Sequence, residues 1–190
     1  MTEPSPLPSP RKAELLEAAY AYALAHGLAG LSLRPLAAAI ESSPRVLLYL
    51  FGSKEGLIQA LLARARADEL AMLDGLKRDQ HGADFSAAVL EVWNWLSGPR
   101  HHDLLVFWLE GYSRSLVDPA GPWAGFARQT VTDWLDVLAS YQPAPWRRTG
   151  EAQAQRTAAL AILRGGLMDL LATGERDRVT AAVCSATGNL

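Results

Sequence analysis

The segment LSLRPLAAAIESSPRVLLYLFGSKEGL, from Leu31 to Leu57, holds the side chains whose types most clearly suggest a specific interaction. Arg45 carries a planar guanidinium group whose paired donors match the O6 and N7 acceptors of guanine. Tyr49 follows one helical turn later and can meet a phosphate or a base edge, whereas the aliphatic Leu48 and Leu50 can touch only thymine methyl groups. Residues of these types, gathered on one short element, are suited to a duplex groove.

Three serines divide this segment into short helices. Ser32 is expected to cap a helical run of about eight residues, Ser43 is expected to cap a helix that starts with a proline, and Ser53 opens a further helix. Helices this short are barely stable alone, because nucleation is costly and few hydrogen bonds follow it. Two of them joined by a tight turn form a helix-turn-helix. Leu47 and Phe51, one turn apart, are expected to point into its core.

The remainder of the chain predicts an all-α fold of about nine helices. Ala- and Leu-rich composition favours helices, and neither period-2 alternation nor a hairpin dipeptide indicates strands. The fourth expected helix starts at Ser53 and ends before Gly82. The other expected helices span residues 11–26, 33–40, 44–51, 84–96, 101–116, 122–141, 151–172 and 175–186.

Composition narrows the class of protein further. Residues Met1 to Pro10 include four prolines and are expected to form a disordered arm. The single cysteine, Cys184, excludes an internal disulfide framework, and no apolar run reaches the roughly 18 residues of a membrane span. We therefore expect a soluble cytoplasmic protein with no membrane contact. Seven Lys and Arg against five Asp and Glu up to Arg66 make the N-terminal part slightly basic, although the whole chain carries −2.

From Arg11 to Leu61 the chain resembles the TetR family of transcriptional regulators, through RKAELLEAAYAYALAHG, LSLRPLA and SSPRVLLYLFGSKEGL. The resemblance implies a disordered arm (1–10), a helix-turn-helix DNA-binding domain (11–56) and a helical ligand-binding and dimerisation domain (57–190). It also implies that Ser32, Ser43 and Lys54 contact phosphates of a double-stranded operator, which fix register without reading sequence. The expected DNA-binding residues are Ser32, Arg34, Ser43, Arg45, Tyr49 and Lys54.

Four positions depart from the family pattern. Glu41 stands where the family usually has a turn glycine, Val46 where it has threonine, Leu48 where it has tyrosine and Leu50 where it often has histidine. Two functions follow. The first is a repressor released from its operator by a small molecule; an activator is also compatible with the sequence. The alternative is a TetR-like protein that has lost sequence-specific DNA binding and acts as a ligand-binding or protein-interaction module.

The resemblance places an inducer and a homodimer interface in the C-terminal part. All six tryptophans follow residue 90, and aromatic pockets suit flat hydrophobic ligands. The expected ligand-binding residues are Trp93, Trp108, Tyr112 and Trp134, although tryptophan at helical spacing is more often core. Glu110 can face a cationic ligand or solvent. Residues 158–172 are apolar on more than one face, as expected of the eighth helix at an interface shared with the ninth; Gly165 and Gly166 imply a close backbone approach or a bend.

Enzymatic chemistry has no support in the sequence. His101 and His102 stand alone, with no Cys or carboxylate at metal-ligand spacing. Neither a nucleophile elbow, nor a phosphate loop, nor a dinucleotide fingerprint is present. We therefore expect no catalytic residue, no metal and no cofactor.

Overall fold

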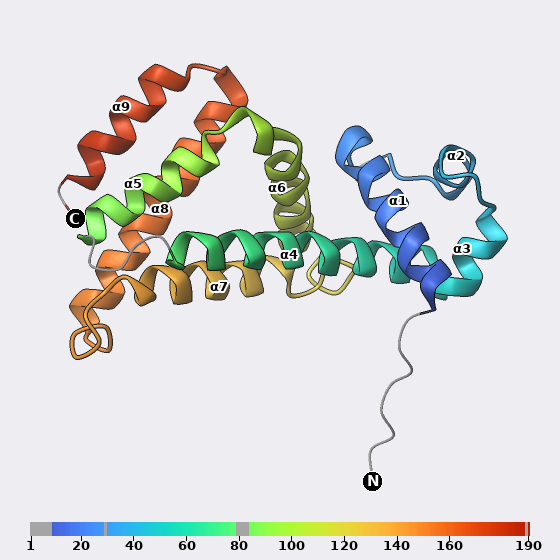
Figure 1. Cartoon of the computed structure of the whole chain (residues 1–190), viewed down its shortest axis with the longest axis horizontal. Coiled ribbons are helices and arrows are strands. Elements are labelled where there is room, and N and C mark those ends of the chain that lie inside the picture. Colours follow the sequence, from blue (N-terminus) through green and yellow to red (C-terminus); the bar gives the residue numbers. More distant parts are fainter. Residues whose placement is uncertain (1–8, 29, 79–83, 189) are drawn as a thin grey trace, which may run out of the picture. The chain divides into compact units, whose positions relative to one another are not determined.

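The computed structural model describes residues 9–28, 30–78, 84–188 and 190, and across these ranges all regular structure is helical (Figure 1). The predicted all-α architecture of nine α-helices is confirmed. The elements are α1 (Pro10–His26), α2 (Leu33–Ala39), α3 (Pro44–Phe51), α4 (Lys54–Arg78), α5 (Phe85–Leu96), a 3₁₀ turn η1 (Pro99–His101), α6 (His102–Val117), α7 (Phe126–Ser140), α8 (Gly150–Thr173) and α9 (Arg176–Thr187).

Two helix starts differ from the prediction for identifiable local reasons. Helix α1 begins at Pro10, and the Ser9 hydroxyl caps it by accepting a hydrogen bond from Lys12 N at 3.2 Å. The end of the expected arm is therefore part of a helix start, while its first eight residues lie outside the described ranges. Helix α7 begins at Phe126 and not at residue 122, because Gly125 adopts a left-handed φ of 77° that interrupts helical geometry.

The chain divides into two compact units. The first contains the described residues up to Ala65 together with Phe107–Phe126, and the second contains the described residues of Arg66–Val106 and Ala127–Leu190. Helices α4 and α6 each contribute to both units.

The first unit packs α1, α2 and α3 around a small apolar core. Helix α1 buries Leu15 and Ala19, α2 buries Leu36, and α3 buries Leu47 and Phe51. Each of these short helices thereby removes apolar surface from water, which supplies the stability that their length cannot.

The C-terminal part of α6 belongs to the same unit and touches α1 and α4. The rings of Tyr20 and Phe107 meet edge to face at 5.8 Å between centroids. Gly111 has Leu62 and Phe126 so close that a Cβ there would lie 3.1 and 3.2 Å from their side chains. The absence of a side chain at position 111 therefore permits tight helix packing.

The second unit is built around α5, which lies beside α8 and α9 (Figure 1). Trp93 on α5 is fully buried and its indole N–H donates to the Thr180 hydroxyl at 3.0 Å. A Cβ at Gly166 would lie 2.8 Å from Val183 and 3.0 Å from Trp93. Close approach of these side chains explains Gly166, whereas a Cβ at Gly165 would meet nothing within 4 Å.

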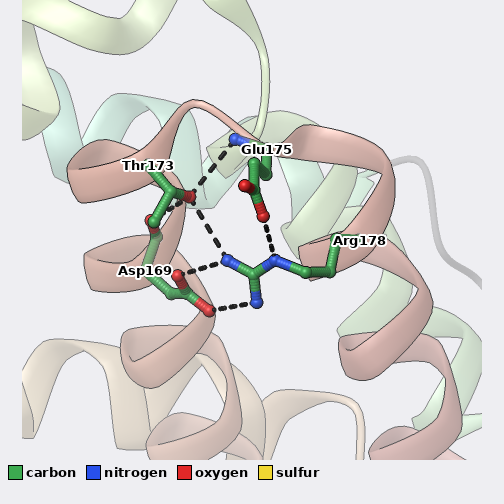
Figure 2. A network of polar contacts seen from close by, with 4 residues as sticks. All are labelled: Asp169, Thr173, Glu175 and Arg178. Carbon is green, nitrogen blue, oxygen red and sulfur yellow. Dashed lines mark hydrogen bonds and ion pairs between the residues drawn. The ribbon is translucent and has the colours of Figure 1, made fainter.

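A polar network holds the corner between α8 and α9 (Figure 2). The Arg178 guanidinium binds both Asp169 oxygens, at 2.9 and 2.7 Å, and also pairs with the Glu175 carboxylate. Hydrogen bonding from Arg178 is the main cause of the lowered pKa of Asp169. Gly174 at the corner adopts φ 71°, a left-handed conformation typical of the residue that ends a helix.

Helices α4 and α7 are joined inside the second unit by a second ion pair. Arg66 donates to both oxygens of Asp133, at 2.7 and 3.0 Å, and Gln129 donates to Oδ1 at 3.0 Å. Beside them, the Trp134 indole N–H donates to the buried Glu69 carboxylate at 2.5 Å. This side of the unit therefore has a polar core in which several groups depend on one another.

Among the described helices, no single one is long and apolar enough to cross a membrane. Helix α3 and the first part of α4 reach the required length and composition only as a pair, and they are bent by 70°.

Candidate nucleic-acid interface

The helix-turn-helix consists of α2, a short turn and α3. The turn is closed by a hydrogen bond from Ser42 N to Ala37 O at 2.8 Å, and Glu41 within it has a φ of 50°. A left-handed conformation is strained for a residue with a Cβ, and glycine adopts it freely. The position noted as a departure from the family pattern is therefore the one at which the backbone favours glycine.

Helix α3 has two distinct faces. Leu47 and Phe51 are 1% and 8% exposed, and they confirm the prediction that these side chains point into the core. Arg45, Val46, Leu48 and Tyr49 are exposed, and Tyr49 reaches 86%. The outward face therefore carries one cation, one phenol and two aliphatic groups.

The Ser43 hydroxyl caps α3 by accepting a hydrogen bond from Val46 N at 3.3 Å. Ser32 also occupies a helix N-cap position, but its side chain makes no capping hydrogen bond. The expectation that Ser32 caps α2 with its hydroxyl is therefore wrong. Its exposed hydroxyl is left available to another acceptor or donor.

The junction of α3 and α4 is tightly packed. Ser53 accepts a hydrogen bond from Gly56 N at 3.0 Å, and a Cβ at Gly56 would lie 2.1 Å from the carbonyl oxygen of Phe51. Only glycine fits at this distance. The same turn presents Lys54 to solvent, beside Glu55, whose own backbone N–H and the Ser53 hydroxyl lower its pKa.

The structure gathers the sequence-predicted DNA-binding residues on α2, α3 and the start of α4. Ser43 is half-buried by its capping role, whereas the other five side chains are exposed. These exposed residues are Ser32, Arg34, Arg45, Tyr49 and Lys54.

Sequence reasoning missed the contribution of Lys12. Its ammonium group lies 5.3 Å from the centroid of the Phe51 ring, so it joins α1 to α3 by a cation–π contact. A lysine near the start of a helix has no sequence signal for this role, because the partner lies 39 residues away.

The four expected ligand-binding aromatic residues fall into two groups. Trp108 and Tyr112 belong to the first unit and their rings are 5.3 Å apart. Trp93 and Trp134 belong to the second unit, where both are buried and both donate their indole N–H to neighbours within that unit. The two groups therefore lie in different compact units.

Glu110 has a role that the sequence analysis did not foresee. Oε2 accepts a hydrogen bond from Leu28 N at 2.7 Å, and Oε1 accepts one from Arg114 Nε at 3.2 Å. The two expectations for Glu110, a cationic ligand or solvent, are replaced by this internal pairing. Two charged or polar partners 82 and 4 positions away satisfy the carboxylate.

Within the described ranges, no group of three or more His, Cys, Asp or Glu side chains is placed to hold a metal ion.

Comparison with known proteins agrees with this arrangement. Residues 15–61 match the family described as "Bacterial regulatory proteins, tetR family". No curated protein sequence gives a significant match. Helices α2 and α3, with the start of α4, lie inside the matching segment.

Solved structures show the same fold over nearly the whole chain. A transcriptional regulator from Rhodococcus sp. Rha1 has a TM-score of 0.76 and 19% identity, covering 93% of this chain and 94% of its own. A putative TetR-family regulator from Rhodococcus sp. has a TM-score of 0.72 and 17% identity, covering 95% and 98%. The multidrug binding protein EbrR, complexed with imidazole, has a TM-score of 0.69 and 22% identity, covering 94% and 90%.

The fold and the matching segment define a helix-turn-helix, formed by α2 and α3, within an all-helical fold. Residues 15–61 are thus similar to the TetR family of bacterial regulatory proteins, and the chain as a whole shares the fold of solved TetR-family regulators.

Proposed function

We propose that this protein is a repressor that binds a duplex operator as a homodimer through α3 and is released by a small hydrophobic or aromatic molecule. It acts on DNA in the cytoplasm and performs no catalysis. The observation that carries the proposal is the outward face of α3, where Arg45 and Tyr49 are exposed while Leu47 and Phe51 anchor the helix from behind.

The elements that precede and follow α3 in the chain also carry exposed cations. Arg34 on α2 and Lys54 at the start of α4 are both exposed. Phosphate contacts of this kind supply affinity that falls steeply with salt, and they orient the helix that reads base edges. Arg45 is the residue best suited to reading a guanine, because its two parallel donors match O6 and N7.

The test is a binding titration against the duplex upstream of the protein's own coding region. Arg45→Ala should weaken binding to this duplex by about 5- to 160-fold, since one bidentate base contact contributes about 1–3 kcal/mol. Arg128→Ala, an exposed arginine on α7, is the matched control and should bind as the wild type does. Equal binding by the Arg45 variant would contradict the assignment of Arg45 as the reading residue.

The homodimer is proposed to form through α8 and α9. The exposed face of α8 carries small or flexible residues at alternating spacings of four and three, the repeat that allows two helices to pack along their length. These residues are Ala154, Ala158, Ala161, Gly165, Met168 and Ala172. Packing inside the chain does not require the glycine at position 165, whereas a second helix backbone at that position does explain it.

Sedimentation equilibrium tests this interface. Ala161→Glu should shift the protein toward the monomer, because an unpaired carboxylate would have to be buried between helices. Ala87→Glu, at an exposed position on α5, is the matched control and should leave the association unchanged. A wild-type chain that sediments only as a monomer would rule out the dimer.

The inducer site is proposed to include Trp108 and Tyr112. Their rings form a tilted pair, and Tyr112 is only half-buried, so part of its side chain is accessible. The likeness in fold to EbrR, whose structure holds imidazole, supports a small-molecule ligand. Trp93 and Trp134 are better explained as core, since each is buried with its N–H already bonded.

Anilinonaphthalene sulfonate, a flat aromatic probe, tests this assignment by its fluorescence on binding. Tyr112→Ala should weaken probe binding several-fold, while Trp146→Leu in the loop before α8 should not. Release of the operator by the probe would connect the two binding events, and probe binding that is unchanged by Tyr112→Ala would exclude this residue from the site.

One observation favours the alternative, a TetR-like protein without sequence-specific DNA binding. Val46 and Leu48 place aliphatic groups on the outward face where the family pattern has polar ones. Binding to random duplex distinguishes the two functions. Retention that weakens steeply with salt supports the regulator, and no retention at low salt supports the alternative.

A further inference from the structure

The outward face of α3 exposes more apolar surface than its fold requires. Val46 and Leu48 are 38% and 41% exposed, although Leu47 and Phe51 already supply the contact that holds the helix. Leu50, the other aliphatic residue considered from the sequence, is half-buried. These two aliphatic groups are therefore accessible to an occupant outside the unit, and its chemistry has to be argued from their surroundings.

The chemistry of this occupant is narrowed by the neighbouring charges. Arg45 is exposed on the same helix, and Arg34 and Lys54 are exposed on α2 and at the start of α4, the elements next to it in the chain; these cations favour a polyanion. A DNA major groove presents donors and acceptors on every base pair, and it presents a single apolar group, the C5-methyl of thymine. A surface that combines cations with exposed Val and Leu matches a groove rich in thymine methyls.

We propose that Val46 and Leu48 are specificity-determining residues that read thymine methyl groups, beside a guanine read by Arg45. The inference rests on the proposed function, because it concerns the same surface and the same duplex. The sequence analysis named Leu48 and Leu50 as residues able to touch thymine methyl groups. The structure keeps Leu48, adds Val46 and leaves out the half-buried Leu50.

Uracil tests the proposal directly, because it pairs as thymine does and lacks the C5-methyl. The full-length protein is used to select sites from two random duplex libraries, one made with thymine and one with uracil. The best thymine-containing site is then remade with uracil at each position in turn. Wild-type affinity should fall about fourfold for each contacted methyl that is removed, the effect expected of one buried carbon group.

Variants separate methyl reading from general affinity. Leu48→Ala should lose most of the difference between thymine and uracil duplexes, whereas Arg45→Ala should weaken both duplexes and keep that difference. Leu116→Ala, which removes a 64% exposed leucine from α6, is the matched control and should behave as the wild type. Leu48 and Leu116 are both solvent-exposed, so neither substitution should unfold the protein. Thermal melting of each variant checks this.

The outcomes distinguish the inference from the function on which it rests. Strong, sequence-specific binding that is equal for thymine and uracil duplexes would overturn methyl reading alone. Failure to enrich any sequence from either library would contradict the proposed function as well, and it would favour a protein partner for the apolar face.

Discussion

Glu110 on α6 accepts a hydrogen bond from the backbone N–H of Leu28, with 2.7 Å between Oε2 and the nitrogen. Leu28 follows the end of α1, where Gly27 adopts a left-handed φ of 74°. The carboxylate therefore satisfies the N–H of a buried loop residue just past the helix, which would otherwise be costly to leave unpaired. Through this bond α6 holds the corner from which the chain continues toward α2.

Removing the acceptor should destabilise the first unit. Glu110→Ala leaves the N–H of the buried Leu28 without its acceptor, and we expect a loss of about 1–3 kcal/mol in the free energy of unfolding, measured with urea. Glu110→Gln is the matched variant, since its amide oxygen can still accept the bond, and it should lose less. Equal losses in the two variants would show that the charge, not the hydrogen bond, stabilises this corner.

Replacing Glu41 by glycine should stabilise the protein. The left-handed φ of 50° costs a residue with a Cβ about 1–2 kcal/mol, part of which is offset because glycine gains freedom in the unfolded chain. We expect a net gain of about 0.5–1 kcal/mol in the free energy of unfolding of Glu41→Gly, measured with urea. Glu41→Ala removes the same charge and keeps the strain, so a comparable gain in that variant would contradict the conformational explanation.

Most of the fold could be predicted because local signals mark its helices. Ser43 before Pro44, and glycine at positions 27, 52 and 174, mark helix starts and ends that the structure has within a residue or two. The start of α7 was predicted too early. The residues before it form hydrogen-bonded turns, and the positive φ of Gly125 separates these turns from the helix. Sequence periodicity does not distinguish such turns from the first turn of a helix.

The candidate site was predictable in part. Exposure on α3 follows from helical spacing once Leu47 and Phe51 are placed inside, and this is why Arg45 and Tyr49 were correctly expected on the outside. The partners of Glu110 and Lys12 were not predictable, because Leu28 and Phe51 reach them only through tertiary packing. Long-range pairs of this kind leave no periodic trace in one sequence.

Gly56→Ala should strongly destabilise the helix-turn-helix. A new Cβ would lie 2.1 Å from the Phe51 carbonyl oxygen, which is backbone and cannot move aside without displacing the end of α3. We expect a loss of about 1–3 kcal/mol or more, measured by thermal or urea unfolding.

Gly75→Ala provides the matched control on the same helix. A Cβ there meets nothing within 4 Å, so the substitution should stabilise α4 by up to about 1 kcal/mol through helix propensity. The same chemical change therefore carries opposite expected signs at two positions of one helix. A loss at position 75 as large as that at 56 would show that glycine is needed in α4 for a reason other than steric fit.

Acid should weaken the second unit through Asp133. Burial alone would raise the pKa of this carboxyl, but the hydrogen bonds from Arg66 and Gln129 outweigh it and hold the pKa below its ordinary value. A lowered pKa in the folded state means that the ionised form stabilises the fold. This contribution is present above the unfolded pKa of about 3.9 and is lost as the pH falls through the lower, folded value. Arg66, whose pKa is raised mainly by the same hydrogen bond, stays charged throughout and adds nothing to the acid response.

Asp133→Asn isolates this effect. The variant should lose about 1–3 kcal/mol of stability at neutral pH, because it removes the charge-assisted hydrogen bonds between the half-exposed Arg66 and the buried Asp133 carboxylate. Urea unfolding at a series of pH values from 7 to about 2.5 should then show a smaller fall in stability for the variant than for the wild type, since its amide does not titrate. Asp136→Asn, at an exposed position on the same helix, is the control and should keep the wild-type slope. An acid slope that is unchanged in Asp133→Asn would show that another carboxylate controls the acid response.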